Sequence, residues 1–101
     1  MIRIHVEDQN HSRTRTFPDD ERESLRWFSD LGAVFGGGLR AIDPHGDGTL
    51  NMHQLSALKP QLTLLLRARW LSVEQRAMCE QLIGLAEEAI ERRGYLFFDG
   101  D

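Results

Sequence analysis

The first residues of the chain alternate between apolar and polar side chains. In "IRIHVE", at residues 2–7, isoleucine and valine are interleaved with arginine, histidine and glutamate. Because successive side chains of a strand point to opposite faces, this alternation predicts a half-buried β-strand. The turn-forming segment "DQNHS" follows, and "RTRTF" at residues 13–17 predicts a second strand that pairs with the first as a hairpin.

A helical period replaces the alternation after Pro18. A first helix is predicted over residues 20–31, because Asp20 followed by Glu23 fits a capping box and Gly32 is typical of a helix end. The apolar positions of this segment lie three residues apart and share one face: Leu25, Phe28 and Leu31.

Two longer helices are predicted in the C-terminal half. The first spans residues 52–69, with a kink or a second start at Pro60, since proline removes a backbone donor. Its apolar stripe consists of Leu55, Leu58, Leu62, Leu65 and Leu66. The second begins at Ser72, which can form a capping box with Gln75, and ends at Gly94. Its apolar face consists of Met78, Cys79, Leu82, Ile83, Leu85, Ala86, Ala89 and Ile90.

Three short segments are the remaining strand candidates. "LRAID" at residues 39–43 predicts a strand, and "TLN" at 49–51 predicts a returning strand or an extended entry to the next helix. The aromatic segment "YLFF" at 95–98 is expected in the interior of the sheet. The pattern as a whole predicts a single α+β domain over residues 1–101. In it, a small, mainly antiparallel sheet is packed by two long C-terminal helices, and the shorter helix covers an edge or the same face.

Composition narrows the choice of partners. The formal net charge is −4, with basic and acidic residues mixed along the chain, so no standing attraction to nucleic acid or to an anionic membrane is expected. The arginine pairs at 13/15 and 67/69 are interpreted as a solvated edge and a solvated helix end. No apolar run is long enough to span a bilayer.

Cysteine usage indicates the compartment. Cys79 is the only cysteine, which excludes an intrachain disulfide and favours a reducing, cytoplasmic location. It lies on the apolar face of its predicted helix, so an inert core thiol is expected rather than a nucleophile.

The segment "DPHGDGTLNMHQ", at residues 43–54, is the strongest candidate for a ligand site. It approximates a calcium-binding EF-hand loop, in which Asp43, Asp47, the Thr49 carbonyl and Asn51 would supply oxygen ligands. His45 stands where a second oxygen ligand is needed, and Gln54 replaces the terminal glutamate. The loop is therefore a degenerate EF-hand pattern.

A second interpretation of residues 43–54 requires no metal. Here "PHGDG" is a turn, and Asn51 caps the following helix with Gln54 as its capping-box partner. This turn-and-cap interpretation is favoured over calcium. A zinc site made by His45 and His53 with Asp43 or Asp47 is a weaker hypothesis, because the spacing matches no familiar ligand pattern.

The segments "DPHGDGTLNMHQL" and "YLFFDGD" resemble a family of small uncharacterised bacterial proteins. That family carries a D-x-x-G-D-T-x-F-N-x-x-Q segment and ends in an aromatic-x-F-x-G-D strand. The resemblance covers residues 42–58 and 95–101, about a quarter of the chain. It departs from the pattern at Gly48, which is an extra residue, and at Leu50, which replaces the aromatic. No activity is implied, and the resemblance supports the turn-and-cap interpretation.

By exclusion, the sequence favours a non-enzymatic, cytoplasmic protein-interaction or regulatory domain, of which an inhibitor or immunity-type partner is one form. No nucleophile–base set or phosphate loop is present. No cofactor is expected, except calcium under the alternative of a metal-responsive module using residues 43–54. An enzyme ranks third, with His5, His45 and His53 as its acid–base candidates. The expected partner is another protein, and self-association is left open.

Overall fold

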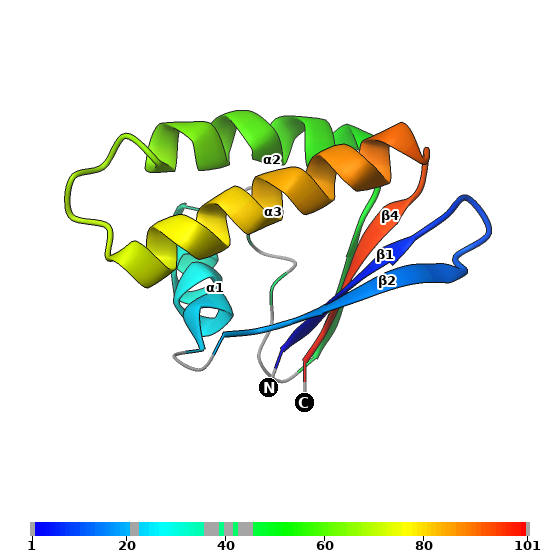
Figure 1. Cartoon of the computed structure of the whole chain (residues 1–101), viewed down its shortest axis with the longest axis horizontal. Coiled ribbons are helices and arrows are strands. Elements are labelled where there is room, and N and C mark those ends of the chain that lie inside the picture. The colour runs from blue at the N-terminus through cyan, green and yellow to red at the C-terminus, as the bar shows by residue number, and fades with distance from the viewer. Residues whose placement is uncertain (1, 21–22, 36–38, 40–41, 43–45, 101) are drawn as a thin grey trace.

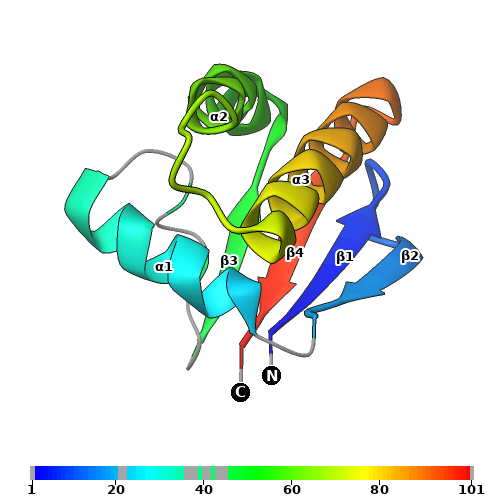
Figure 2. The same ribbon diagram turned by 60° about the vertical axis from the view of Figure 1, so that its left-hand side comes forward.

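The computed structural model describes residues 2–20, 23–35, 39, 42 and 46–100. In chain order, the elements are β1 (Arg3–Glu7), β2 (Arg13–Pro18), α1 (Ser24–Phe35), β3 (Asp47–Leu50), α2 (Met52–Leu65), α3 (Val73–Glu91) and β4 (Tyr95–Asp99). The strands form one antiparallel sheet in the order β2–β1–β4–β3. The three helices lie on one face of this sheet (Figures 1 and 2). The predicted α+β architecture, with two longer C-terminal helices and one shorter helix, is confirmed.

The two central strands come from the two ends of the sequence. β1 pairs with β2 as the predicted hairpin and with β4 on its other side. The apolar half of the alternation predicted in β1 is confirmed, because Ile4 and Val6 are fully buried in the core. The strand is not half-buried as predicted, since His5 and Glu7 on its other face are buried as well. Ile4 and Val6 meet the buried side chains of the neighbouring strands and of the helices, and these form one core that includes Leu50, Leu55, Leu58, Leu62, Met78, Cys79, Leu82, Leu96 and Phe98.

The first helix begins later than its acidic residues suggest. α1 starts at Ser24, and the two preceding aspartates accept hydrogen bonds from its first amides: Asp20 from the Ser24 amide (2.8 Å) and Asp19 from the Leu25 amide (3.1 Å). Glu23 has a φ of 52°, outside the helical region, so it cannot be the helical member of a capping box. The helix also continues past Gly32 to Phe35.

The two longer helices pack side by side over the sheet (Figure 1). α2 is a single helix through Pro60, so the predicted second start there is wrong. Pro60 is exposed, so solvent can satisfy the Ser56 carbonyl that lacks a helical donor. α3 begins as predicted, because Ser72 and Gln75 form both hydrogen bonds of a capping box. None of the described helices is long and apolar enough to cross a bilayer.

The strand predicted at residues 39–43 is not found in the part of that range that the structure describes. The Ile42 amide donates to the Leu39 carbonyl (3.1 Å), which is a tight turn, and neither residue belongs to a strand. Both side chains are buried, so a short apolar run here marks core packing rather than a strand. The predicted extended entry to α2 is confirmed, and it forms the end of β3, which pairs with β4.

Candidate functional site

Of the residues proposed as calcium ligands, the structure describes three: Asp47, Thr49 and Asn51. Asp43 lies outside the described residues, as does His45. Asp47 and Thr49 are exposed on β3, where the backbone pairs with β4. The Asn51 side chain accepts a hydrogen bond from the Gln54 amide (3.0 Å), and the Gln54 side chain accepts one from the Asn51 amide (2.9 Å).

These contacts confirm the predicted cap at Asn51 and Gln54. The predicted turn is wrong at Asp47 and Gly48, which belong to β3, and its first residues, 44 and 45, lie outside the described residues. A side-chain oxygen that caps a helix satisfies a backbone amide that would otherwise lack a partner. Among the described residues, no group of three or more histidine, cysteine, aspartate or glutamate side chains is arranged to hold a metal ion. The calcium and zinc alternatives both depend on Asp43 or His45, and they stay hypotheses.

The histidines proposed as acid–base candidates are not brought together where the structure describes them. His5 is 3% exposed on β1, whereas His53 is exposed on α2. His5 Nδ1 lies 2.8 Å from the Thr16 hydroxyl, and its Nε2 lies 3.6 Å from the Asp99 carboxylate. Thr16 is directly opposite His5 in the β1–β2 register, so this contact is a cross-strand side-chain pair.

A hydroxyl, an imidazole and a carboxylate in a row can activate a nucleophile, but only when hydrogen bonds join them. The distance between His5 and Asp99 exceeds hydrogen-bond length, and within the described chain His5 Nε2 has no hydrogen-bond partner. The arrangement is therefore better explained as packing on the open face of the sheet.

The open face of the sheet, opposite the helices, is occupied by contacts between its own side chains. The Arg13 guanidinium lies 5.5 Å from the centre of the Phe97 ring, and the His11 ring stacks on Tyr95 at 4.0 Å. His11 Nδ1 also lies 2.9 Å from the buried Glu7 carboxylate. Aromatic and charged groups on this face thus already have partners within the protein.

Cys79 has the environment that the sequence predicted. The thiol is fully buried and donates a hydrogen bond to the Leu62 carbonyl (3.3 Å). Burial raises the pKa of the Cys79 thiol to about 11, because the thiolate would lose its solvation. A thiol that stays protonated is a poor nucleophile, so Cys79 acts as a core residue.

Most of the large apolar side chains left in solvent come from one short stretch of the described chain, residues 64–73. Four large hydrophobic residues are exposed: Met52 (38%), Leu64 (64%), Trp70 (65%) and Val73 (82%). Three of the four come from the end of α2, the following connection and the first residue of α3. Large exposed apolar side chains grouped in this way are typical of a contact surface for another molecule.

A cleft of about 350 Å³ opens beside Leu64 and Trp70. We call it the apolar cleft, and its walls come from α1, from the connection between α1 and β3, from α2 and from the residues that follow α2: Leu31, Leu39, Gln61, Leu64, Leu65, Ala68 and Trp70. Its volume is at the lower end of the range for small-molecule pockets, about 300–1,000 Å³, so it can accept a bulky apolar side chain.

The wall of the apolar cleft that contains Trp70 is held in place by two sets of contacts. The Trp70 ring meets the edge of Trp27 on α1, with 5.9 Å between ring centres and a 69° angle between planes. On the α3 side, the Arg76 guanidinium donates to the Leu66 carbonyl (2.6 Å) and to the Ala68 carbonyl (3.1 Å). These bonds fix the turn that precedes Trp70, so the cleft is pre-organised for binding.

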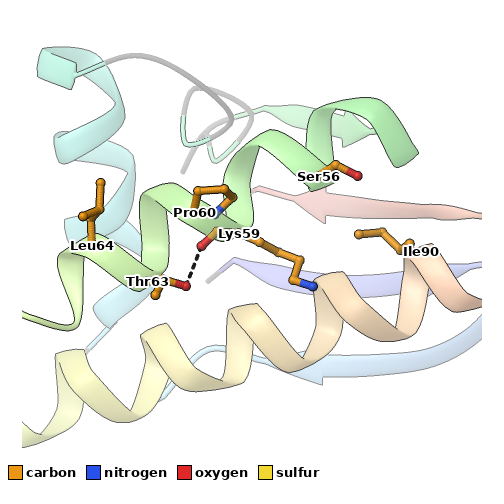
Figure 3. Close-up of a pocket in the computed structure, with 6 residues that line it drawn as sticks. All are labelled: Ser56, Lys59, Pro60, Thr63, Leu64 and Ile90. Carbon is orange, nitrogen blue, oxygen red and sulfur yellow. Dashed lines mark hydrogen bonds between the residues drawn. The ribbon is translucent and has the colours of Figure 1, made fainter.

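A shallow groove of about 690 Å³ runs along α2 and ends at Leu64 (Figure 3). We call it the α2 groove, and it is lined by Ser56, Lys59, Pro60, Thr63, Leu64 and, from α3, Ile90. Because Leu64 lines both hollows, the apolar cleft and the α2 groove adjoin each other at this side chain.

This surface was not identified from the sequence, although a signal was present. Leu64, Leu65 and Leu66 are consecutive, and a helix with one buried face cannot bury all three. Leu64 falls outside the stripe that predicts the core. It is therefore the leucine that periodicity leaves exposed.

Comparison of the chain with protein-family models, with curated proteins and with solved structures finds no match. The assignment of a functional surface consequently depends on the geometry of this chain alone. The resemblance to the small bacterial family at residues 42–58 and 95–101 stays a hypothesis.

Proposed function

We propose that this protein is a non-enzymatic, cytoplasmic interaction domain that binds another protein through the apolar cleft and the adjoining α2 groove. The observation that carries the proposal is the exposure of Leu64 and Trp70 at the rim of a pre-formed apolar hollow. An inhibitor or an immunity-type partner is the form of regulation that this proposal favours.

The energetics of protein interfaces support this choice. A tryptophan that inserts into or borders a pocket is the type of residue that contributes most to the free energy of binding. Leaving such a large apolar side chain exposed to water also costs free energy. Leu64 and Trp70 are each about two-thirds exposed, so most of their apolar surface is still available to be buried. By contrast, the aromatic rings on the open face of the sheet are half-buried and already stacked.

The chemistry of the rest of the chain also fits a binding function. The buried thiol of Cys79 and the cross-strand contacts of His5 do not provide an activated nucleophile. A single free cysteine fits a reducing compartment, which supports the cytoplasmic location.

The proposal is tested by capture experiments with tagged protein in an extract of its host. Wild-type protein should retain a partner that Leu64→Ser and Trp70→Ser proteins fail to retain. Met52→Ser is the matched control, because Met52 is an exposed apolar residue at the opposite end of α2. Equal retention by all four proteins would contradict the assignment of the surface.

A further inference from the structure

The surface around the apolar cleft differs in charge from the rest of the protein. Between Asp47 and Glu74 the sequence contains no aspartate or glutamate, although the chain as a whole has a formal net charge of −4. The cations in this stretch are Lys59, Arg67 and Arg69. This stretch supplies α2, the turn after it and most of the cleft wall, so the α2 side of the binding surface is locally basic. On the α3 side of the α2 groove, Ile90 is flanked in sequence by the exposed acids Glu87 and Glu91.

The arginines beside the cleft are free to bind a ligand. Arg67 and Arg69 are exposed, and neither forms an ion pair with a carboxylate of the described chain. Arg76 differs, because its guanidinium donates to backbone carbonyls of the same turn. Within α1 the exposed charges are balanced, with one arginine, Arg26, and one aspartate, Asp30.

From this combination we infer that the partner presents an acidic amphipathic segment, whose apolar side chain enters the cleft and whose carboxylates contact Arg67 and Arg69. The inference rests on the proposed function and specifies its partner. Arginine is suited to this contact, because its planar group can donate two parallel hydrogen bonds to one carboxylate.

The α2 groove indicates an extended occupant rather than a single side chain. It continues from Leu64 along α2 toward Ser56, and Lys59 extends from α2 at its edge (Figure 3). Ser56 and Leu64 are separated by about two helical turns, or roughly 12 Å along the axis. A helical or extended peptide lying along α2 would therefore place one acidic residue near Lys59 and others near the arginines.

An anionic membrane is the alternative ligand for this surface, because a bilayer also combines negatively charged headgroups with an apolar interior. The protein segment is favoured because the apolar surface is a concave hollow with fixed walls, which receives a protruding side chain. A bilayer binds best to apolar side chains that protrude from a convex or flat amphipathic face.

The test uses two synthetic peptides and a vesicle preparation. The peptides are amphipathic helices with identical leucine and phenylalanine positions and no tryptophan, and their remaining positions are glutamate in one and lysine in the other. The vesicles mix phosphatidylserine with phosphatidylcholine. The fluorescence of Trp27 and Trp70, the only tryptophans of the chain, reports binding at the cleft.

The glutamate peptide should bind saturably and at least about tenfold more tightly than the lysine peptide, and its affinity should fall as salt is added. The double variant Arg67→Glu/Arg69→Glu should lose about tenfold in affinity for the glutamate peptide. Leu64→Ser should weaken binding of the same peptide. Arg13→Glu/Arg15→Glu, on the edge strand β2, has the same spacing, is the matched charge control and should leave the affinity unchanged.

Three results would overturn the inference. The first is equal affinity for the two peptides, or indifference to charge reversal at Arg67 and Arg69. The second is a fluorescence response to the vesicles without one to the glutamate peptide, which would assign the surface to a membrane. The third is no binding of any probe. The capture experiment distinguishes these results from a failure of the proposed function. If Leu64→Ser still abolished retention of a partner from the extract, the inference of an acidic segment would be rejected and the proposed function would stand.

Discussion

Two leucines of α2, two residues apart, should respond differently to the same truncation. Leu62→Ala should lower the free energy of unfolding by about 2–5 kcal/mol, whereas Leu64→Ala should lower it by less than about 1 kcal/mol. The two substitutions remove the same atoms from the same helix. The difference between them therefore measures burial.

The magnitudes follow from the positions of the two side chains. Leu62 is fully buried, and its carbonyl accepts a hydrogen bond from the Cys79 thiol. Leu62 therefore lies where α2 and α3 pack against each other. Removing its three outer carbons loses about 0.8 kcal/mol each in transfer free energy, and the cavity adds to that loss. Leu64 is 64% exposed, so only about a third of the transfer term applies. The higher helix propensity of alanine offsets part of what remains.

The assay is urea unfolding monitored by the helical circular dichroism signal. Both variants should keep the wild-type dependence of the unfolding free energy on urea, so that the midpoints report stability. Losses of similar size for the two variants, or a loss below about 0.5 kcal/mol for Leu62→Ala, would refute the packing face assigned to α2.

Four further outcomes are expected. Thermal melts in chelator and in millimolar calcium should superimpose, because capping already uses the Asn51 side chain. Asn51→Ala should cost about 1 kcal/mol in either solution, as the loss of an N-cap does. Cys79 should react with a thiol reagent only after unfolding. The raised pKa of the Cys79 thiol also makes stability depend on pH. From pH 9.0 to about 11 the unfolded thiol ionises and the folded thiol does not, so the unfolding free energy falls by up to about 1.4 kcal/mol per pH unit. The variant Cys79→Ala should lack this fall. Gly94→Ala should destabilise by more than about 2 kcal/mol, because a Cβ there would lie 1.8 Å from the Glu7 carbonyl oxygen.

Three of these outcomes have a specific result that would contradict them. A calcium-specific rise in melting temperature that disappears in Asp43→Ala would restore the calcium alternative. Rapid labelling of native Cys79 would mean that its helix face is exposed. A neutral Gly94→Ala would place the connection between α3 and β4 farther from β1. Ser72→Ala removes the other capping-box residue and should match Asn51→Ala in cost.

The elements that the sequence predicted well are those whose stability is local. The β1–β2 hairpin follows from alternation and turn residues, and the start of α3 follows from Ser72 and Gln75, whose bonds lie within one turn. The start of α1 was placed too early, because any of several acidic residues can cap a helix. The Leu25 amide bonds to Asp19, and this depends on the path of the chain between β2 and α1.

The parts that could not be predicted depend on contacts distant in sequence. The aromatic composition of residues 95–98 predicted an interior strand, and β4 is one, but nothing local indicates that its two neighbours are β1 and β3. At Leu39 and Ile42 the apolar pattern fits a strand or buried packing equally well. The apolar cleft joins α1 to the end of α2, so its lining could not be assembled from periodicity, even though Leu64 and Trp70 could each be noted as unusual.

The position of β4 has a consequence for the order of folding. Ile4 pairs with Phe98, and Leu50 with Leu96, so both partners of β4 must wait for the last strand to be synthesised. Until then, the nascent chain can form the first hairpin and the helices, while β3 has no sheet neighbour and one side of β1 is unpaired. Closing a loop of almost the whole chain is an entropic barrier that local structure cannot lower, so folding should be slow for a domain of this size. During that interval, the unpaired edge of β1 and its apolar face are open to association with other chains.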